Sequence, residues 1–265
     1  MGLLVVALAI TGGCFGQTRG DRVVVATAAR GATESGEPLT SFTTRQGWTV
    51  KLQKAKLALG PIYFFENKPT AWYKRLLSIN KAYAHAGGNE LKGAVLLEVL
   101  EQYPVDLLAS TPTDTGVVPA LGGLAQAVEL ELHPVGQVAP GAPESAYALL
   151  GKETIYLEGQ ADKEGQTVRF AGRLSIPDVG TKRIVPNIHA ELDLAGATAE
   201  SGRLVLSVLV DQVLANVRFD TLTQEKDGVY ALDDEGAQAH TALLLGLRSR
   251  YSYSAAWARS VERGE

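Results

Sequence analysis

Sulfur-containing residues are almost missing from this sequence. Its 265 residues include one cysteine, Cys14, and one methionine, Met1. A single cysteine cannot form an intrachain disulfide or a zinc site built from several thiolates, and a single terminal methionine does not supply a thioether copper site within a fold. A disulfide framework and a cysteine-rich metal site are therefore excluded.

The sequence also lacks the short motifs that identify many enzymes. It has no Walker loop, no dinucleotide-binding glycine pattern, no H-E-x-x-H, no G-x-S-x-G and no EF-hand loop. These absences favour a protein that is not an enzyme.

A concentrated positive charge is missing as well. The formal net charge is −4, and the 25 lysines and arginines are scattered along the chain. Without a basic run, neither nucleic acid nor anionic lipid is an expected partner. Hydrophobic residues make up 46% and charged residues 20%, which is ordinary for a globular protein with a packed core.

The amino-terminal stretch MGLLVVALAITGGC is apolar and ends at the sole cysteine. Its run from Leu3 to Ile10 has the length of the apolar core of a signal peptide and is too short to span a bilayer. Three small residues, at positions 11–13, come directly before Cys14. This arrangement resembles the lipobox of bacterial lipoproteins, which their signal peptidase recognises.

The resemblance implies export, cleavage after Gly13 and a lipid on Cys14 that anchors the chain to the membrane. Residues 1–13 would then be a signal peptide and residues 14–21 a tether. Phe15 follows the cysteine in place of the Asp that retains many lipoproteins at the inner membrane. The resemblance therefore favours the outer membrane, with the domain in the periplasm or at the surface. The alternative is an unprocessed buried strand with a free cysteine.

The longest β-type stretch is 47–66, GWTVKLQKAKLALGPIYFFE. Apolar residues alternate with polar ones on both sides of Gln53 and Lys54 but change parity there, which predicts a strand with a β-bulge. After Gly60-Pro61, the run Ile62 to Phe65 predicts a strand buried on both faces. This stretch is expected to form the centre of a β-rich core.

Further short apolar or alternating runs predict strands at 22–28, 105–109, 126–133, 154–161, 167–175, 184–194, 203–210 and 251–257. Residues 92–102 suit a strand or a helix, and we favour a strand that pairs with 105–109. Residues 110–123, rich in Thr, Pro and Gly, are expected to be irregular. A four-residue turn at 162–165 joins two strands as a hairpin, and Pro186 predicts an edge strand or a bulge.

Helical spacing is confined to two segments and one short turn. Residues 68–83 and 234–248 show helical periodicity, and 211–215 suits a single turn. No internal repeat and no linker divides the chain. The sequence therefore predicts a mainly β protein, a β-sandwich-like antiparallel domain with two or three short helices, as a single domain over 22–265.

The best candidate site consists of two polar rows on predicted strands. Glu129, Glu131 and His133 alternate on one strand, and His189, Glu191 and Asp193 alternate on another. Each trio lies on one side of its strand. If the strands are neighbours, the imidazoles and carboxylates could hold a divalent metal such as zinc or copper. The alternative, favoured by the polar outer face of any one-sided sheet, is a solvated surface.

Two further histidines and a group of aromatic residues are also candidates for a functional site. His85 lies in a Gly-rich loop and is a further candidate metal ligand. His240 lies on the apolar face of the last predicted helix, which favours a core histidine. The aromatic residues Trp48, Tyr63, Phe64, Phe65, Trp72 and Tyr73 could form a stacking platform for a sugar, but core packing explains them as well.

Three functions remain open on these observations. The first is a lipid-anchored binding or accessory protein of the cell envelope, for a metal ion or a small ligand. The second is a structural envelope component that acts through a protein partner. The third is a hydrolase that uses an acid pair such as Glu129 and Asp193, which no motif requires.

Overall fold

The structure is a computed structural model, and it describes residues 21–35, 39, 41–66, 93–136, 147–177, 183–196, 202–225 and 227–258. The segments in between, and both ends of the chain, lie outside this description. Among the sequence predictions, the helix at 68–83, the candidate ligand His85 and the tether at 14–21 (apart from Asp21) fall there.

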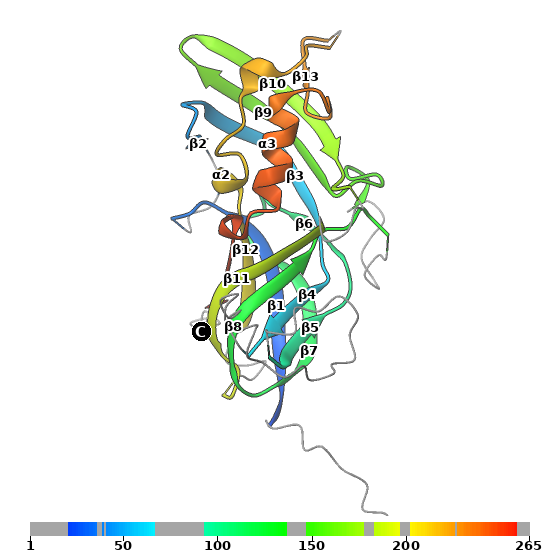
Figure 1. Cartoon of the computed structure of the whole chain (residues 1–265), viewed down its shortest axis with the longest axis vertical. Coiled ribbons are helices and arrows are strands. Elements are labelled where there is room, and N and C mark those ends of the chain that lie inside the picture. Colours follow the sequence, from blue (N-terminus) through cyan, green and yellow to red (C-terminus); the bar gives the residue numbers. More distant parts are fainter. Residues whose placement is uncertain are drawn as a thin grey trace, which may run out of the picture.

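The described chain forms two β-sheets with a few short helices, so the predicted mainly β, sandwich-like fold is confirmed (Figure 1). The larger sheet has eight strands in the order β11 (Ile184–Asp193), β8 (Leu124–Glu131), β4 (Ile62–Phe65), β5 (Val95–Val99), β7 (Thr113–Leu121), β1 (Arg22–Ala32), β12 (Arg203–Leu209) and β14 (Tyr253–Ala258). It curls so that its first and last strands, β11 and β14, lie against each other. Its pairs are antiparallel except for β1 with β12.

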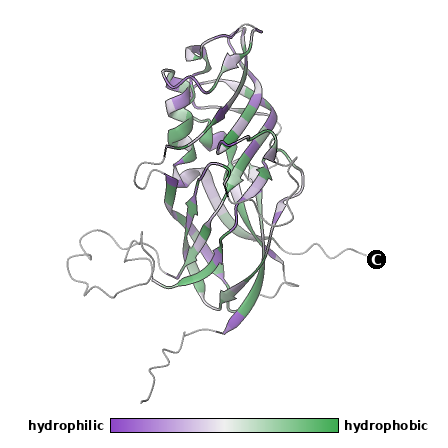
Figure 2. Ribbon diagram, turned by 90° about the vertical axis from the view of Figure 1, so that its right-hand side faces the viewer, coloured by the Kyte–Doolittle hydropathy of each residue, from purple (hydrophilic) through white to green (hydrophobic). Residues whose placement is uncertain are grey.

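The smaller sheet has six strands, in the order β13 (Tyr230–Ala231), β10 (Gln166–Leu174), β9 (Ile155–Lys163), β3 (Thr49–Leu59) and β2 (Phe42–Thr43), with β6 (Tyr103–Asp106) also paired to β3. Short helices α2 (Val210–Val213), η3 (Phe219–Thr221), α3 (Gln238–Leu247) and η4 (Arg250–Ser252) complete the fold. Along many strands hydrophilic and hydrophobic residues alternate (Figure 2), whereas β12 is buried along almost its whole length.

The predicted central stretch connects the two sheets. β3 belongs to the smaller sheet and β4 to the larger one, and the register of β3 shifts between Leu52 and Lys54, which confirms the bulge. The turn needs glycine at position 60, because φ is +117° and a Cβ there would lie 2.4 Å from the Glu101 carbonyl oxygen. β4 is buried on one face only, since Tyr63 on the other face is partly exposed.

The hairpin of β9 and β10 is tighter than the sequence indicated. Lys163 pairs with Gln166, so the turn has two residues, Glu164 and Gly165, and not four. Both have positive φ, 50° and 82°, as a type I′ turn requires. The strands extend into the predicted turn because this turn matches their twist. β11 is an edge strand whose register shifts beside Pro186, as predicted.

Three further regions differ from their predictions. Residues 113–121, expected to be irregular, form β7, because pairing with β1 along its length outweighs its turn-like composition. β5 and β6 are strands but belong to different sheets and do not pair with each other. The last helix begins at Gln238 and not at 234, because the Asp234 carboxylate accepts hydrogen bonds from Gly236 N and Thr223 Oγ1 in the preceding loop.

One hydrophobic core connects both sheets and the helices. On the inner face of the smaller sheet, Phe219 packs edge-on against Trp48 at 5.7 Å and tilted against Phe170 at 4.8 Å between ring centroids. α3 adds Leu243 and Leu247 to this core. The two sheets therefore form one packed unit over the described residues. None of the helices in these described ranges has the length and hydropathy of a membrane span.

Candidate functional site: a cleft beside His133

The two polar rows predicted from the sequence lie on neighbouring strands. β8 pairs with β11 in antiparallel fashion, so the condition of adjacency is met. The register nevertheless separates the rows, since Glu131 faces Ile184 while His189 faces Ala127. The two positions are four residue steps apart along β8, a distance of roughly 13 Å. The rows therefore do not converge on one metal ion.

Each row instead forms its own local pair. His133 Nε2 lies 2.6 Å from Glu131 Oε2, and His189 Nε2 lies 3.8 Å from Glu191 Oε1. The side chains of His189 and Glu191 are 66% and 68% exposed. Over the described ranges, no three residues of His, Cys, Asp or Glu gather in an arrangement that could hold a metal. The proposed joint site of His133, Glu131, His189 and Glu191 is thus corrected to two separate pairs.

The acid pair considered for a hydrolase is also separated by register. Asp193 faces Leu124 at the start of β8, while Glu129 faces Tyr63 on β4. Leu124 and Glu129 are five residue steps apart along β8, which is roughly 16 Å. The two carboxylates are too far apart to share a substrate bond.

His133 borders a cleft of about 450 Å³ between the two sheets. The cleft lies where three connections meet: the turn between β3 and β4, the turn between β5 and β6, and the segment after β8. Its lining includes Pro61, Leu100, Gln102, His133, Val135 and Arg183. A mostly apolar hollow with a few polar groups is the usual form of a small-ligand site.

Gln102 fixes one wall of this cleft. Its Nε2 donates to the carbonyl oxygens of His133 at 2.9 Å and Pro134 at 3.2 Å, and its Oε1 accepts from Gly136 N at 3.0 Å. Gln102 is only 4% exposed, and its own carbonyl accepts a hydrogen bond from the Tyr147 hydroxyl at 2.8 Å. The segment that carries His133 is therefore held in place before any ligand arrives.

The polar groups of the cleft come from His133 and Arg183. In the neutral tautomer that donates from Nε2 to Glu131, the Nδ1 atom of His133 is a hydrogen-bond acceptor. Arg183 donates from Nε to the Ile176 carbonyl at 2.9 Å, which orients a guanidinium in the lining. The cleft thus combines a histidine, an arginine and apolar walls.

The sequence pointed to His133 and Glu131 but missed Gln102 and Arg183. Gln102 lies in the turn between two strands of different sheets, and its role depends on the chain returning to the same place after β8. No local pattern reports such a contact. The peptide bond between Gly60 and Pro61, beside the cleft, is cis. The only sign of it in the sequence is the Gly-Pro dipeptide, because cis peptide bonds occur almost only before proline.

The predicted aromatic platform is largely core. Trp48 and Phe64 are 2% and 1% exposed, so neither can stack on a ligand from solvent. His240, expected in the core, lies half-exposed at the margin of α3, because the buried face is formed by Ala239, Ala242, Leu243 and Leu247. Trp72 and Tyr73 lie outside the described residues.

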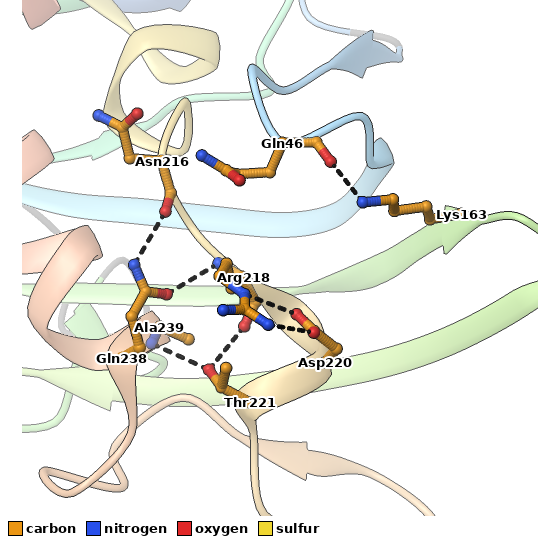
Figure 3. A network of polar contacts seen from close by, with 8 residues as sticks. All are labelled: Gln46, Lys163, Asn216, Arg218, Asp220, Thr221, Gln238 and Ala239. Carbon is orange, nitrogen blue, oxygen red and sulfur yellow. Dashed lines mark hydrogen bonds and ion pairs between the residues drawn. The ribbon is translucent and has the colours of Figure 1, made fainter.

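A second polar network lies beside η3 and the start of α3 (Figure 3). Arg218 NH2 lies 2.7 Å from Asp220 Oδ2, and this partner lowers the pKa of Asp220. Gln238 donates to the Asn216 carbonyl and accepts from Arg218 N, while Thr221 Oγ1 accepts from Ala239 N. These groups satisfy one another and hold the η3 turn against α3, so we assign the network a structural role.

Comparison with known proteins does not identify a family for this chain. No family model matches the chain, and no curated protein matches it. Among solved structures, "MbnP from Methylosinus trichosporium" is similar, with a TM-score of 0.45 and 11% identity over 90% of this chain and 99% of that chain. At this level the similarity assigns neither a family nor a function.

Proposed function

We propose that this chain is a non-catalytic binding protein of the bacterial cell envelope that takes a small ligand in the cleft beside His133. The observation that carries the proposal is the preformed cleft, whose wall is fixed by the three hydrogen bonds of the buried Gln102 side chain. A site that is already ordered binds without the entropic cost of closing a loop. The separated acid pair supports binding over hydrolysis.

The lining indicates the chemistry of the ligand. Pro61, Leu100 and Val135 suit a small apolar body, and the Arg183 guanidinium suits an acidic group. The Nδ1 lone pair of His133 suits a hydrogen-bond donor. The ligand class that fits is a small organic acid with a hydroxyl or amino group.

A direct binding measurement tests this function. A panel of small hydroxy and amino acids is titrated into the protein by calorimetry, and H133A is expected to weaken binding at least tenfold. H189A is the matched control, because His189 is also a strand histidine beside a glutamate but lies outside the cleft. Equal losses in both variants, or no ligand in the panel, would contradict the proposal.

A divalent metal ion is a second candidate ligand, supported by the His133–Glu131 pair. Metal-binding histidines commonly donate their other ring N–H to a carboxylate, which is the arrangement at 2.6 Å here. Native mass spectrometry of protein purified without chelator is expected to record one zinc or copper ion that H133A removes and H189A retains. If the unaltered protein has the mass of the chain alone, the metal ion is excluded and the organic acid remains the proposed ligand.

The membrane anchor is a separate part of the proposal. The resemblance of residues 11–14 to a lipobox supports a lipid on Cys14, and β1 begins at Arg22. Seven residues between them span at most about 25 Å, so the domain would stay close to the membrane. Mass spectrometry of the amino-terminal peptide from a membrane fraction should find a diacylglyceryl-modified Cys14, and C14S should move the protein to the soluble fraction. An intact, unmodified Met1 peptide would rule the anchor out.

A further inference from the structure

Cations that are scattered in the sequence gather on the outer face of the smaller sheet. The strands β3, β9 and β10 lie side by side, and alternate residues of each point away from the core. The outward charged residues are Lys51, Lys54, Lys56, Glu158, Asp162, Arg169 and Arg173. Asp106 on β6 lies opposite Lys56 on the same side of the sheet, so five cations face three carboxylates on this surface, although the whole chain has a net charge of −4. We call this surface the cationic face.

The strand register arranges these groups in rows across the sheet. Lys51 on β3 pairs with Gln160 on β9, which pairs with Arg169 on β10. The two cations therefore lie about 10 Å apart, on either side of the Gln160 side chain. In the same way Lys56 faces Tyr156, which faces Arg173. The result is two parallel lines of cations, on β3 and β10, with the side chains of β9 between them.

Hydrogen bonds hold the central line of side chains in place. Glu158 accepts from the Tyr156 hydroxyl at 2.6 Å and from Lys54 Nζ at 2.9 Å. Asp162 accepts from Thr167 and from Gln160, and Arg173 lies over the Tyr156 ring at 5.3 Å. Both carboxylates of β9 are thus engaged within the face.

The cations on β3 and β10 have fewer charged partners than the carboxylates on β9. Within the described part of the chain, neither Lys51 nor Arg169 has a carboxylate at ion-pair distance, and Lys56 lies 3.9 Å from Asp106. Arg169 makes one long hydrogen bond of 3.5 Å, to the Asp227 carbonyl. Lys51 and Arg169 are exposed and leave a positive charge that can attract an anion, while the Lys56 side chain is only 20% exposed.

We propose that the cationic face is a docking surface for an extended acidic segment of a partner protein. Alternate side chains of an extended strand are about 7 Å apart, which is the spacing of Lys54 and Lys56 along β3, while Arg169 and Arg173 on β10 are four residues, about 13 Å, apart. Two lines of positive charge therefore complement a strand whose Asp or Glu side chains point to one side, and Arg173, whose Nε donates to the Leu149 carbonyl at 2.7 Å, marks the end of the face that residues 147–150 adjoin.

The position of the face favours a protein over a lipid surface. β1 begins at the end of the molecule opposite to the β9–β10 hairpin (Figure 1). Arg22, where β1 begins, is therefore far from the cationic face. A membrane that holds the amino-terminal end would leave this face turned toward other envelope proteins.

Poly-L-glutamate is a defined probe for this surface. Fluorescence anisotropy with labelled poly-L-glutamate at 50 mM salt should record binding that weakens as salt is raised. The variant K51Q/R169Q should weaken binding about tenfold, because it removes the two cations that no carboxylate neutralises. The charge-reversal variant K51E/R169E should abolish binding.

The matched control is R22Q/R203Q, which removes two exposed arginines from the larger sheet. It should change the affinity less than twofold, and all variants should keep the unfolding temperature because their side chains are exposed. No binding by the unaltered protein, or an equal loss in K51Q/R169Q and R22Q/R203Q, would overturn the proposal. Binding to phosphatidylglycerol vesicles without binding to poly-L-glutamate would also overturn it, in favour of a membrane surface.

Discussion

The outer faces of the two sheets carry opposite charge. The cationic face of the smaller sheet has five lysines and arginines against three carboxylates, Glu158, Asp162 and Asp106. In the larger sheet, the neighbouring strands β11, β8, β4 and β5 contain no lysine or arginine, and they carry Glu98, Glu129, Glu131, Glu191 and Asp193. We call this second surface the acidic face. The near-neutral net charge of −4 conceals a separation of charge between two surfaces of one domain.

The two faces also differ in how their tyrosines are held. On the acidic face, burial and the charges of Glu131 and Glu98 raise the pKa of Tyr63. On the cationic face, burial and a hydrogen bond to Glu158 raise the pKa of Tyr156 to about 12, although Arg173 opposes the shift. On either face a nearby carboxylate disfavours the negatively charged phenolate and so raises the pKa of the tyrosine. Only on the cationic face does a cation, Arg173, oppose this increase.

The largest expected effect tests whether the two faces belong to one cooperative unit. F219A removes the ring that packs against Trp48 and Phe170, and burial of this ring is complete. The variant should lose about 3–5 kcal/mol in free energy of unfolding, because the cavity cannot collapse within a packed core. Calorimetry should record one transition at a lower temperature.

Two separated transitions in F219A would contradict this expectation and divide the sheets into independent units. The control is Y251A, since the Tyr251 side chain is 69% exposed and its removal should leave the transition almost unchanged.

The next effect compares two glutamines, one in the cleft and one on the cationic face. Q102A leaves the Gly136 N–H and two carbonyls without their buried partner, which should cost about 2 kcal/mol of stability and weaken ligand binding in the cleft. Q160A removes a half-exposed side chain that bonds to Asp162, and should cost less than about 0.5 kcal/mol. Denaturant unfolding of both variants measures the difference, and equal costs would remove the role assigned to Gln102.

The fold was predictable from the sequence wherever a local residue pattern determines the structure. The parity change at Gln53 and Lys54 located the bulge of β3, and Pro186 located the irregular edge strand β11. The failures lie where long-range pairing decided the structure. β7 has the Thr, Pro and Gly content of a loop, and only its register with β1 makes it a strand.

The candidate site was predictable only in part for the same reason. Alternation placed Glu131 and His133 on one side of β8, and their pair at 2.6 Å follows from that spacing. The offset between His133 and His189 depends on the register of β8 with β11, which alternation alone does not fix. The cationic face was missed because Lys51 and Arg169 are far apart in sequence and meet only through β9.

A pH titration sharpens the contrast between the two tyrosines. A pKa raised in the folded state stabilises the protein below the ordinary tyrosine value of 10.0, and for Tyr156 this contribution is lost as the pH rises from there through about 12. Absorbance at 295 nm should therefore show Tyr156 ionising late. E158Q should lower the pKa of Tyr156, and R173Q should raise it further, because Arg173 favours the phenolate.

Y156F identifies which part of the absorbance change belongs to this residue, and Tyr63 provides the comparison on the acidic face. There, E131Q should lower the pKa of Tyr63 and leave Tyr156 unaffected. A shift of both tyrosines in either variant would mean that the two faces are not electrically separate.

The smallest effect compares one ion pair from each face. The Lys54–Glu158 pair is short, at 2.9 Å, but its side chains are 48% and 26% exposed, so solvent screens it. A double-mutant cycle with K54A and E158A should give a coupling of about 0.5 kcal/mol, which falls when salt is added. On the acidic face, His189 and Glu191 are farther apart and more exposed, so H189A should leave the stability unchanged within error. A coupling at Lys54 that resists high salt would mean that the hydrogen-bonded side chains of the cationic face act as one network, with Tyr156 and Arg173 as members.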